Sequence, residues 1–216
     1  SYGCRTGWFM TGWEFVALLF AWAVAGGSPG SATLAIAGTA MGRGRAAGLA
    51  ISTGIICGSA IWGLAAALGM SALMLANAWV VEVIRYLGAA YLMFLAYKAM
   101  KSALSDKPLA VVGAKQGDLR SLFFKGLLVH LTNPKAIFAW GAIFAIISPP
   151  GSAPTDIALA FISLITVSCG VFWGYGILFS LGRFVRGYQK MWRWFEGAFA
   201  IMFGAAGLKI LTARLA

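Results

Sequence analysis

Two proline-centred tripeptides interrupt apolar stretches of this chain and are its most chemically suggestive residues. They read Ser28-Pro29-Gly30 and Asn133-Pro134-Lys135. Proline inside a helix removes one N–H donor and clashes with the carbonyl four residues back, so each tripeptide predicts a broken helix. The helices would restart at about 30–41 and 135–148, with Ser28 and Asn133 as caps and each proline in a first turn.

Two half-helix N-termini would then lie inside an apolar region, where their free N–H groups and positive dipole ends favour an anion such as a carboxylate. The tripeptides therefore predict a binding site for a small molecule. The alternative is a pair of ordinary proline kinks. The predicted binding residues are Ser28, Pro29, Gly30, Ser31, Asn133, Pro134 and Lys135.

Lys135 is the most informative charge, because the run that follows it is apolar from Ile137 to Ile147. A cation at membrane depth costs at least ~2.5–3.5 kcal/mol on insertion scales, so it should face the interior and have a partner. That partner could be a ligand carboxylate or the carbonyls of the preceding half-helix. The alternative is that Lys135 extends its ammonium to the cytoplasmic interface.

Four further residues are candidates for gating or coupling. Glu82 and Arg85 are spaced i, i+3 and can pair on one helix face. His130 is the single histidine of the chain, and Ser59 lies in a second apolar run. Glu14 and Glu196 are expected at the membrane interface. No metal-ligand cluster or cofactor motif is present, so neither a metal nor a cofactor is predicted.

Composition shows which elements must hold these residues. Hydrophobic residues make up 61% of the 216 residues and charged residues only 11%, whereas a soluble chain has roughly 25% charged residues. The chain is therefore predicted to be an all-α polytopic membrane protein, one transmembrane domain over 1–216, with residues 1–9 a tag or a misassigned start. Six runs are long enough to span a bilayer: about 12–41, 46–70, 77–98, 122–148, 155–181 and 194–214.

Basic residues set the expected orientation. Twelve of the seventeen lie in the loops after the first, third and fifth runs, while the loops at 71–76 and 149–154 carry none. The positive-inside rule then places these three loops in the cytoplasm and both termini outside. The net charge of +11 is attributed to contact with anionic lipid rather than nucleic acid.

An internal repeat accompanies this charge pattern. Residues 88–94, GAAYLMF, match residues 197–203, GAFAIMF, at four of seven positions with an offset of 109. Cys57-Gly58, Trp62-Gly63 and Leu68-Gly69 recur at offsets of 111 to 113, and the two proline tripeptides are 105 apart. Two copies of three runs each, about 10–104 and 119–216, would form a 3+3 inverted repeat with broken helices one and four, an architecture typical of secondary transporters.

Several of these residues carry a resemblance to a known family. Together with Ser28-Pro29-Gly30, they are Gly42-Arg43, Ala47-Gly48, the segment from Leu87 to Leu92 and the segment from Thr132 to Ala136. Over residues 10 to about 212, the chain resembles the lysine exporter (LysE) superfamily, specifically its homoserine/threonine exporter type. The resemblance implies an inner-membrane carrier that exports an amino acid or related metabolite, driven by the proton motive force and without ATP hydrolysis.

The chain departs from that family pattern at three positions. Ser31 replaces the second proline of a Pro-Gly-Pro motif, Ser59 stands where some members have an acid, and His130 stands where asparagine is common. The change at Ser59 puts a carboxylate-based proton or cation site in that run in doubt.

Two other functions were weighed against a carrier. An intramembrane serine protease would need Ser59 as nucleophile beside His130, but the usual glycine-x-serine-glycine context is missing. A passive channel would not need broken helices at the membrane midplane. A carrier is favoured, not an enzyme, with a zwitterionic amino acid as substrate and the bilayer as its other partner. The pairs Gly54/Gly58 and Gly170/Gly174 permit close helix contact, either between the repeats or in a homodimer.

Overall fold

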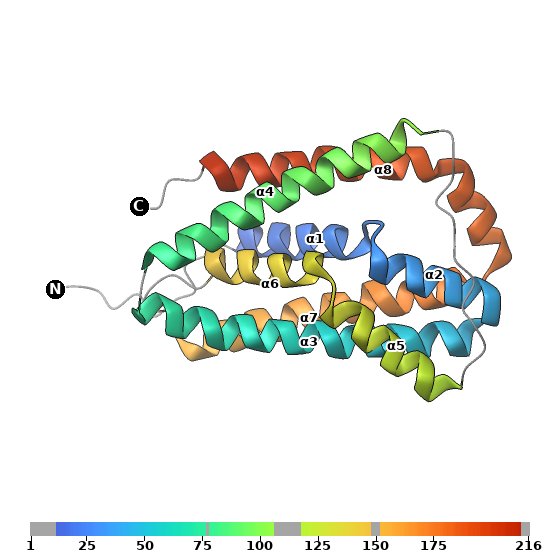
Figure 1. The fold of residues 1–216 in the computed structure, drawn as a ribbon, viewed down its shortest axis with the longest axis horizontal. Coiled ribbons are helices and arrows are strands. Elements are labelled where there is room, and N and C mark those ends of the chain that lie inside the picture. Colours follow the sequence, from blue (N-terminus) through green and yellow to red (C-terminus); the bar gives the residue numbers. More distant parts are fainter. Residues whose placement is uncertain (1–11, 77, 106–117, 148–151, 213–216) are drawn as a thin grey trace.

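The chain is all-helical in the computed structural model, which describes residues 12–76, 78–105, 118–147 and 152–212 (Figure 1). Eight helices fall in these ranges: α1 Gly12–Gly27, α2 Ser31–Arg43, α3 Arg45–Ala76, α4 Ala78–Ala103, α5 Leu119–Leu131, α6 Pro134–Ile147, α7 Pro154–Leu178 and α8 Gly182–Thr212. The predicted all-α class is confirmed.

Two of the described helices are long and apolar enough to cross a membrane by themselves, over Arg45–Gly69 in α3 and over Pro154–Leu178. The pair α1 and α2 is bent by 60° at its break and makes a third candidate if it counts as one broken span. The shorter apolar helix α6 covers Pro134–Ile147. The chain is therefore a multi-pass, all-helical membrane protein. The number of six spans and the inverted repeat stay predictions.

The first predicted break is confirmed, but its capping differs from the prediction. The Ser28 hydroxyl donates to the Ala25 carbonyl at 2.8 Å, so Ser28 completes α1 instead of starting the next helix. Helix α2 begins one residue after Gly30, which is its N-cap in an extended conformation. The Gly30 N–H donates to Thr33 Oγ1 at 2.9 Å, and this bond fixes the start of α2 beyond Pro29.

The second break is confirmed together with its cap. Helix α5 ends at Leu131, and α6 begins at Pro134. The Asn133 side-chain oxygen accepts from the Lys135 N–H at 3.1 Å, which is the bond expected of an asparagine N-cap. The Thr132 hydroxyl donates back to the Leu128 carbonyl at 2.8 Å and closes the end of α5.

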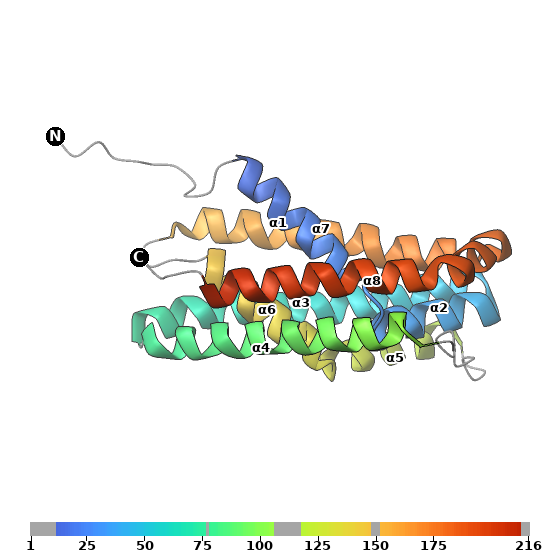
Figure 2. The same ribbon diagram turned by 90° about the horizontal axis from the view of Figure 1, so that it is seen from above.

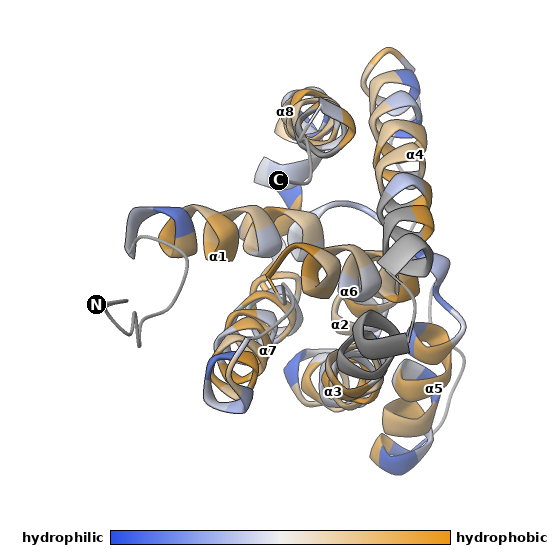
Figure 3. Ribbon diagram, turned by 90° about the vertical axis from the view of Figure 1, so that its left-hand side faces the viewer, coloured by the Kyte–Doolittle hydropathy of each residue, from blue (hydrophilic) through white to orange (hydrophobic). Residues whose placement is uncertain are grey.

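The breaks meet halfway along the molecule. Figure 1 shows α1 and α6 side by side over one half of the long axis, with α2 and α5 over the other half. Helices α3 and α7 run along both halves and pack on each other, while α4 and α8 form a separate pair (Figure 2). Seen along the long axis, α4 and α8 lie together on one side of the remaining helices (Figure 3). This arrangement brings residues about 105 positions apart in the chain to one place.

Glycine allows close helix contact, though not at all the predicted positions. A Cβ at Gly54 would overlap the Phe123 carbonyl of α5, and one at Gly58 would lie 2.9 Å from His130 Cβ. The first predicted pair is thus confirmed as a contact surface between α3 and α5. The second pair makes no such contact within the part of the chain that the structure describes, because Gly170 and Gly174 have nothing within 4 Å of a Cβ, and its alternative role in a homodimer stays a prediction. Helix α7 instead approaches α3 through Gly176.

Candidate functional site

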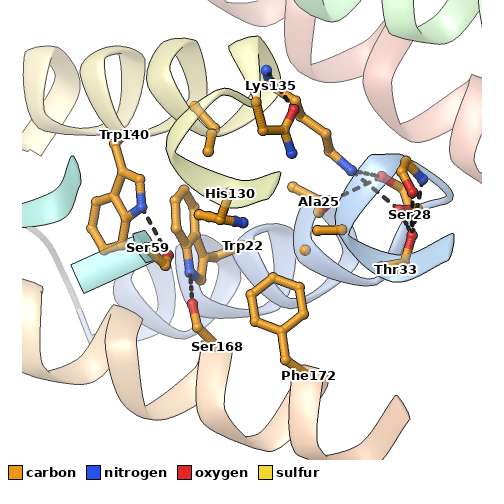
Figure 4. Close-up of a pocket in the computed structure, with 16 residues that line it drawn as sticks. Trp22, Ala25, Ser28, Thr33, Ser59, His130, Lys135, Trp140, Ser168 and Phe172 are labelled. Carbon is orange, nitrogen blue, oxygen red and sulfur yellow. Dashed lines mark hydrogen bonds between the residues drawn. The ribbon is translucent and has the colours of Figure 1, made fainter. Parts of the chain in front are cut away.

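A cavity of about 50 Å³ lies where the two breaks meet (Figure 4). It is enclosed by α1, α2, α3, α5, α6 and α7, and a volume of this size holds a few water molecules. Its polar and aromatic lining consists of Trp22, Ser28, Thr33, Ser59, His130, Asn133, Lys135, Trp140, Ser168 and Phe172.

The Lys135 ammonium crosses from the second break to the first. Its Nζ donates to the Ser28 carbonyl at 3.2 Å and makes a second, short bond to the Ser28 hydroxyl. The same Nζ lies 5.7 Å from the centre of the Phe203 ring of α8. Lys135 therefore binds inside the protein rather than at the interface, and the carbonyl it meets belongs to α1 rather than to the preceding half-helix α5.

The two half-helix N-termini are not equivalent. Asn133 caps α6 with its side chain, whereas α2 starts after Gly30, which has no side chain and makes no side-chain cap. A Cβ on Gly30 would lie 3.7 Å from Lys135 Nζ. The first turn of α2 thus combines uncapped N–H groups with an adjacent ammonium, which together form an environment for an anion.

Two tryptophans form the other wall of the cavity. Trp22 Nε1 donates to the Leu164 carbonyl at 3.1 Å and to Ser168 Oγ at 3.0 Å. Trp140 Nε1 donates to Ser59 Oγ at 3.0 Å, and the two indole rings meet edge to face at 4.5 Å. Both indole N–H groups are therefore satisfied by the protein, so the rings present apolar surface to the cavity.

His130 lies in the cavity wall with its ring 5.8 Å from Phe172. It is 5% exposed, and its Nδ1 is buried without a hydrogen-bond partner among the described residues. A catalytic histidine would be oriented by a third group at this nitrogen, while Ser59 Oγ is held by Trp140 instead. The geometry therefore gives no support to the serine protease alternative.

The structure brings together most of the predicted site residues. Ser28, Gly30, Asn133, Lys135, His130 and Ser59 all line the cavity. Pro29, Ser31 and Pro134 lie at the breaks without lining it, and Ser31 is exposed. Glu82 and Arg85 lie on α4, but their side chains fall outside those the structure describes.

Sequence reasoning missed two features of this region. Trp22 and Trp140 lie six residues before Ser28 and six after Pro134, so their distance from the breaks was a usable signal. Glu196 was expected at the interface, and that was wrong: it is 3% exposed and lies halfway along α8. The error arose because α8 begins at Gly182, twelve residues before the predicted start of that span.

Comparison with known proteins identifies the family of the chain. The chain matches the LysE type translocator family over residues 24–214. It is 30% identical over 192 residues to the threonine efflux protein of Escherichia coli (strain K12), covering 87% of this chain and 92% of that relative.

Two other relatives extend the comparison. The chain is 31% identical over 194 residues to the threonine efflux protein of Salmonella typhi, covering 87% of this chain and 92% of the relative. It is 33% identical over 116 residues to the leucine efflux protein of Enterobacter sp. (strain 638), covering 54% of each chain. No solved structure matches the chain significantly. Since the family match covers most of the sequence, this protein belongs to the LysE type translocator family, whose members are transporters and not enzymes.

Proposed function

We propose that this protein exports a zwitterionic amino acid across the inner membrane, as a secondary carrier driven by the proton motive force. The observation that carries the proposal is the Lys135 ammonium, which lies in the central cavity at the uncapped start of α2. The efflux proteins related to this chain, named for threonine and leucine, support an amino acid as substrate.

The substrate carboxylate would bind between Lys135 and the first turn of α2. An ammonium has three donors, and two of those on Lys135 are used by the oxygens of Ser28. A carboxylate would take over one of these bonds and add a charge-assisted bond that is shorter and stronger than the bond it replaces. The substrate side chain would face the Trp22 and Trp140 rings and Phe172, with His130 Nδ1 as a further polar contact.

Alternating access fits the position of this site between two apolar clusters. One cluster contains Trp22, Trp140, Phe144 and Leu164, on the side where α1 begins and α6 ends. The other contains Ala37, Ala40 and Phe179, with Tyr188 packed against them, where α2 and α7 end. Separating one cluster and then the other would expose the site to each side in turn.

A 3+3 inverted repeat would explain how this exchange is possible. In Figure 1 α1 runs inward from one end of the molecule and α5 runs inward from the opposite end, as the first helices of two inverted repeats would. The repeat-related pairs α3 with α7 and α4 with α8 each pack together. Rocking of one repeat against the other would then change the contacts between these helices and alternate the carrier between an inward-open and an outward-open state. A homodimer is not needed for this mechanism.

Lys135→Met is the direct test, with Lys125→Met as the matched control on an exposed position of α5. Purified protein in proteoliposomes would be assayed for exchange of labelled against unlabelled threonine and leucine. Loss of a charge-assisted bond worth about 1.5–3 kcal/mol should lower kcat/KM about 10- to 100-fold for Lys135→Met. Equal exchange by the two variants would overturn the site, and no exchange by the wild type with any amino acid would overturn the function.

A further inference from the structure

Glu196 is the one buried acid among the side chains that the structure describes. It is 3% exposed, and its Oε1 has no hydrogen-bond partner among those residues. An ionised carboxylate without partners is costly in a low-dielectric interior, so such a group either takes up a proton or acts on a nearby cation. Glu196 is not among the residues that line the cavity, so substrate contact does not explain its burial.

Glu196 lies between the cavity and the end of the molecule where α4 finishes. Three residues earlier in α8, Arg193 Nε donates to the carbonyl of Ala103, the last residue of α4, at 2.9 Å. Seven residues later in α8, the Phe203 ring contacts the Lys135 ammonium. Residues seven apart share a helix face, and the rise to Phe203 is about 10 Å. Glu196 therefore lies on the face of α8 that reaches the substrate site, closer to the end where α4 finishes.

Four titratable groups, on α4, α6, α7 and α8, lie close enough to this carboxyl to interact with it by charge. The positive charges of Lys135 of α6 and Lys98 of α4 interact with the Glu196 carboxyl. The charge of Glu196 in turn interacts with the hydroxyls of Tyr175 of α7 and Tyr188 of α8. The Tyr175 hydroxyl in turn donates a short bond to the Gly27 carbonyl at the end of α1. A change of charge at Glu196 thus alters the electrostatic environment of two groups. They are the Lys135 ammonium and the Tyr175 hydroxyl, which donates to the end of α1.

We propose that Glu196 is the proton-binding carboxyl that couples export to the proton gradient. This assignment rests on the proposed function of the chain as a proton-driven exporter. The ionised carboxylate attracts the ammonium of a zwitterionic substrate across the cavity wall, without lining the cavity itself. Protonation removes this attraction, so proton and substrate bind in competition, which is what antiport requires.

The cycle balances in charge and protons. With Glu196 ionised, the carrier binds the zwitterion from the inside and releases it outside. One proton from the outer medium then adds to a Glu196 oxygen, is carried inward on the returning carrier and leaves to the cytoplasm, which restores the carboxylate. One positive charge enters for each zwitterion exported, so the membrane potential and the pH gradient both drive export.

Glu196→Gln tests this assignment, with the exposed Glu14→Gln as the matched control. In proteoliposomes with labelled threonine and leucine as probes, Glu196→Gln should retain exchange at saturating substrate within about threefold of wild type. Proton movement coupled to substrate, read by a trapped pH dye, should fall at least about tenfold. The KM for exchange should rise as the pH falls in the wild type and become independent of pH in Glu196→Gln. Glu196→Asp should restore coupled proton movement, while Glu14→Gln should match wild type throughout.

Three results would overturn the assignment. They are coupled proton movement by Glu196→Gln, loss of exchange and coupling in equal proportion in that variant, and failure of Glu196→Asp to restore coupling. The second result would mean that Glu196 supports the carrier as a whole. Absence of any exchange in the wild type would instead overturn the proposed function, and the Glu196 assignment with it.

Discussion

At the scale of single residues, the defining feature is a lysine from one half of the chain that binds the broken backbone of the other half. Lys135 and Ser28 are 107 positions apart, yet the ammonium contacts both oxygens of Ser28. The Ser28 carbonyl, which lies beyond the last residue of α1, accepts from both the Lys135 ammonium and the Thr33 hydroxyl. In the proposed function, a substrate carboxylate would replace one of the bonds that Lys135 makes to Ser28.

The uncapped start of α2 gives a prediction at this scale. Gly30→Asp would place a carboxylate at an N-cap position, where aspartate is favoured over glycine, and within reach of Lys135 Nζ, which lies 3.7 Å from a Cβ at Gly30. This fixed carboxylate should occupy the substrate subsite. Transport should fall at least about tenfold, while the melting temperature of the protein in detergent should stay the same or rise.

The control for this variant is Gly12→Asp, which adds the same charge at the start of α1, where nothing lies within 4 Å of a Cβ. It should transport like the wild type. Normal threonine and leucine exchange by Gly30→Asp would show that carboxylates do not bind at the start of α2. A lowered melting temperature would show that the introduced carboxylate does not pair with Lys135.

At the scale of elements, the local sequence determines where helices stop, and glycines determine how closely they pack. Pro29 and Pro134 predicted both breaks, because proline removes one backbone donor and its ring clashes with the carbonyl four residues back. The start of α2 was not predictable in the same way, since Ser28 does not cap it and Thr33 instead accepts from the Gly30 N–H at the break. Which glycines meet another helix was also beyond the sequence, because GxxxG spacing marks a flat helix face but not the neighbour that fills it.

The contact between α3 and α5 gives a prediction for stability. Gly54→Ala places a methyl group against the Phe123 carbonyl, and overpacking of this kind costs roughly 1–3 kcal/mol. Gly170→Ala, at the first position of the second GxxxG pair in α7, meets nothing and should be neutral or gain up to about 1 kcal/mol from helix propensity. Melting followed by size-exclusion chromatography in detergent should therefore show a lower melting temperature for Gly54→Ala alone. Equal melting temperatures would mean that α3 and α5 are farther apart than the structure has them.

At the scale of the whole molecule, the ends of the helices separate two sides. The ends of α2, α4 and α7 and the starts of α3, α5 and α8 gather at one end in Figure 1, and the basic residues of the sequence concentrate near these helix ends. The positive-inside rule predicts that this end is cytoplasmic. Helix α1 begins and helix α8 ends toward the opposite end (Figure 1), as the predicted topology requires.

Cysteine labelling tests this orientation. In a variant without the native cysteines, Thr155→Cys at the start of α7 should react with an impermeant maleimide added to intact cells. Leu104→Cys, beyond the end of α4, is 71% exposed and should react only after the membrane is permeabilised. The reverse pattern would invert the topology, and reaction of both from outside would contradict the helix directions on which the inverted repeat depends.

The sequence by itself determined the membrane class, the all-helical fold, the two breaks, the asparagine cap and that Lys135 faces the interior and has a partner there. Each follows from local chemistry, because composition, proline geometry and the cost of a buried charge act within a few residues of the chain. Only the tertiary structure decided what Lys135 binds, which tryptophans form the cavity wall and that Glu196 is buried beside the site. These depend on which helices lie next to one another, and a pairing between segments about 100 residues apart leaves no mark in either segment read alone.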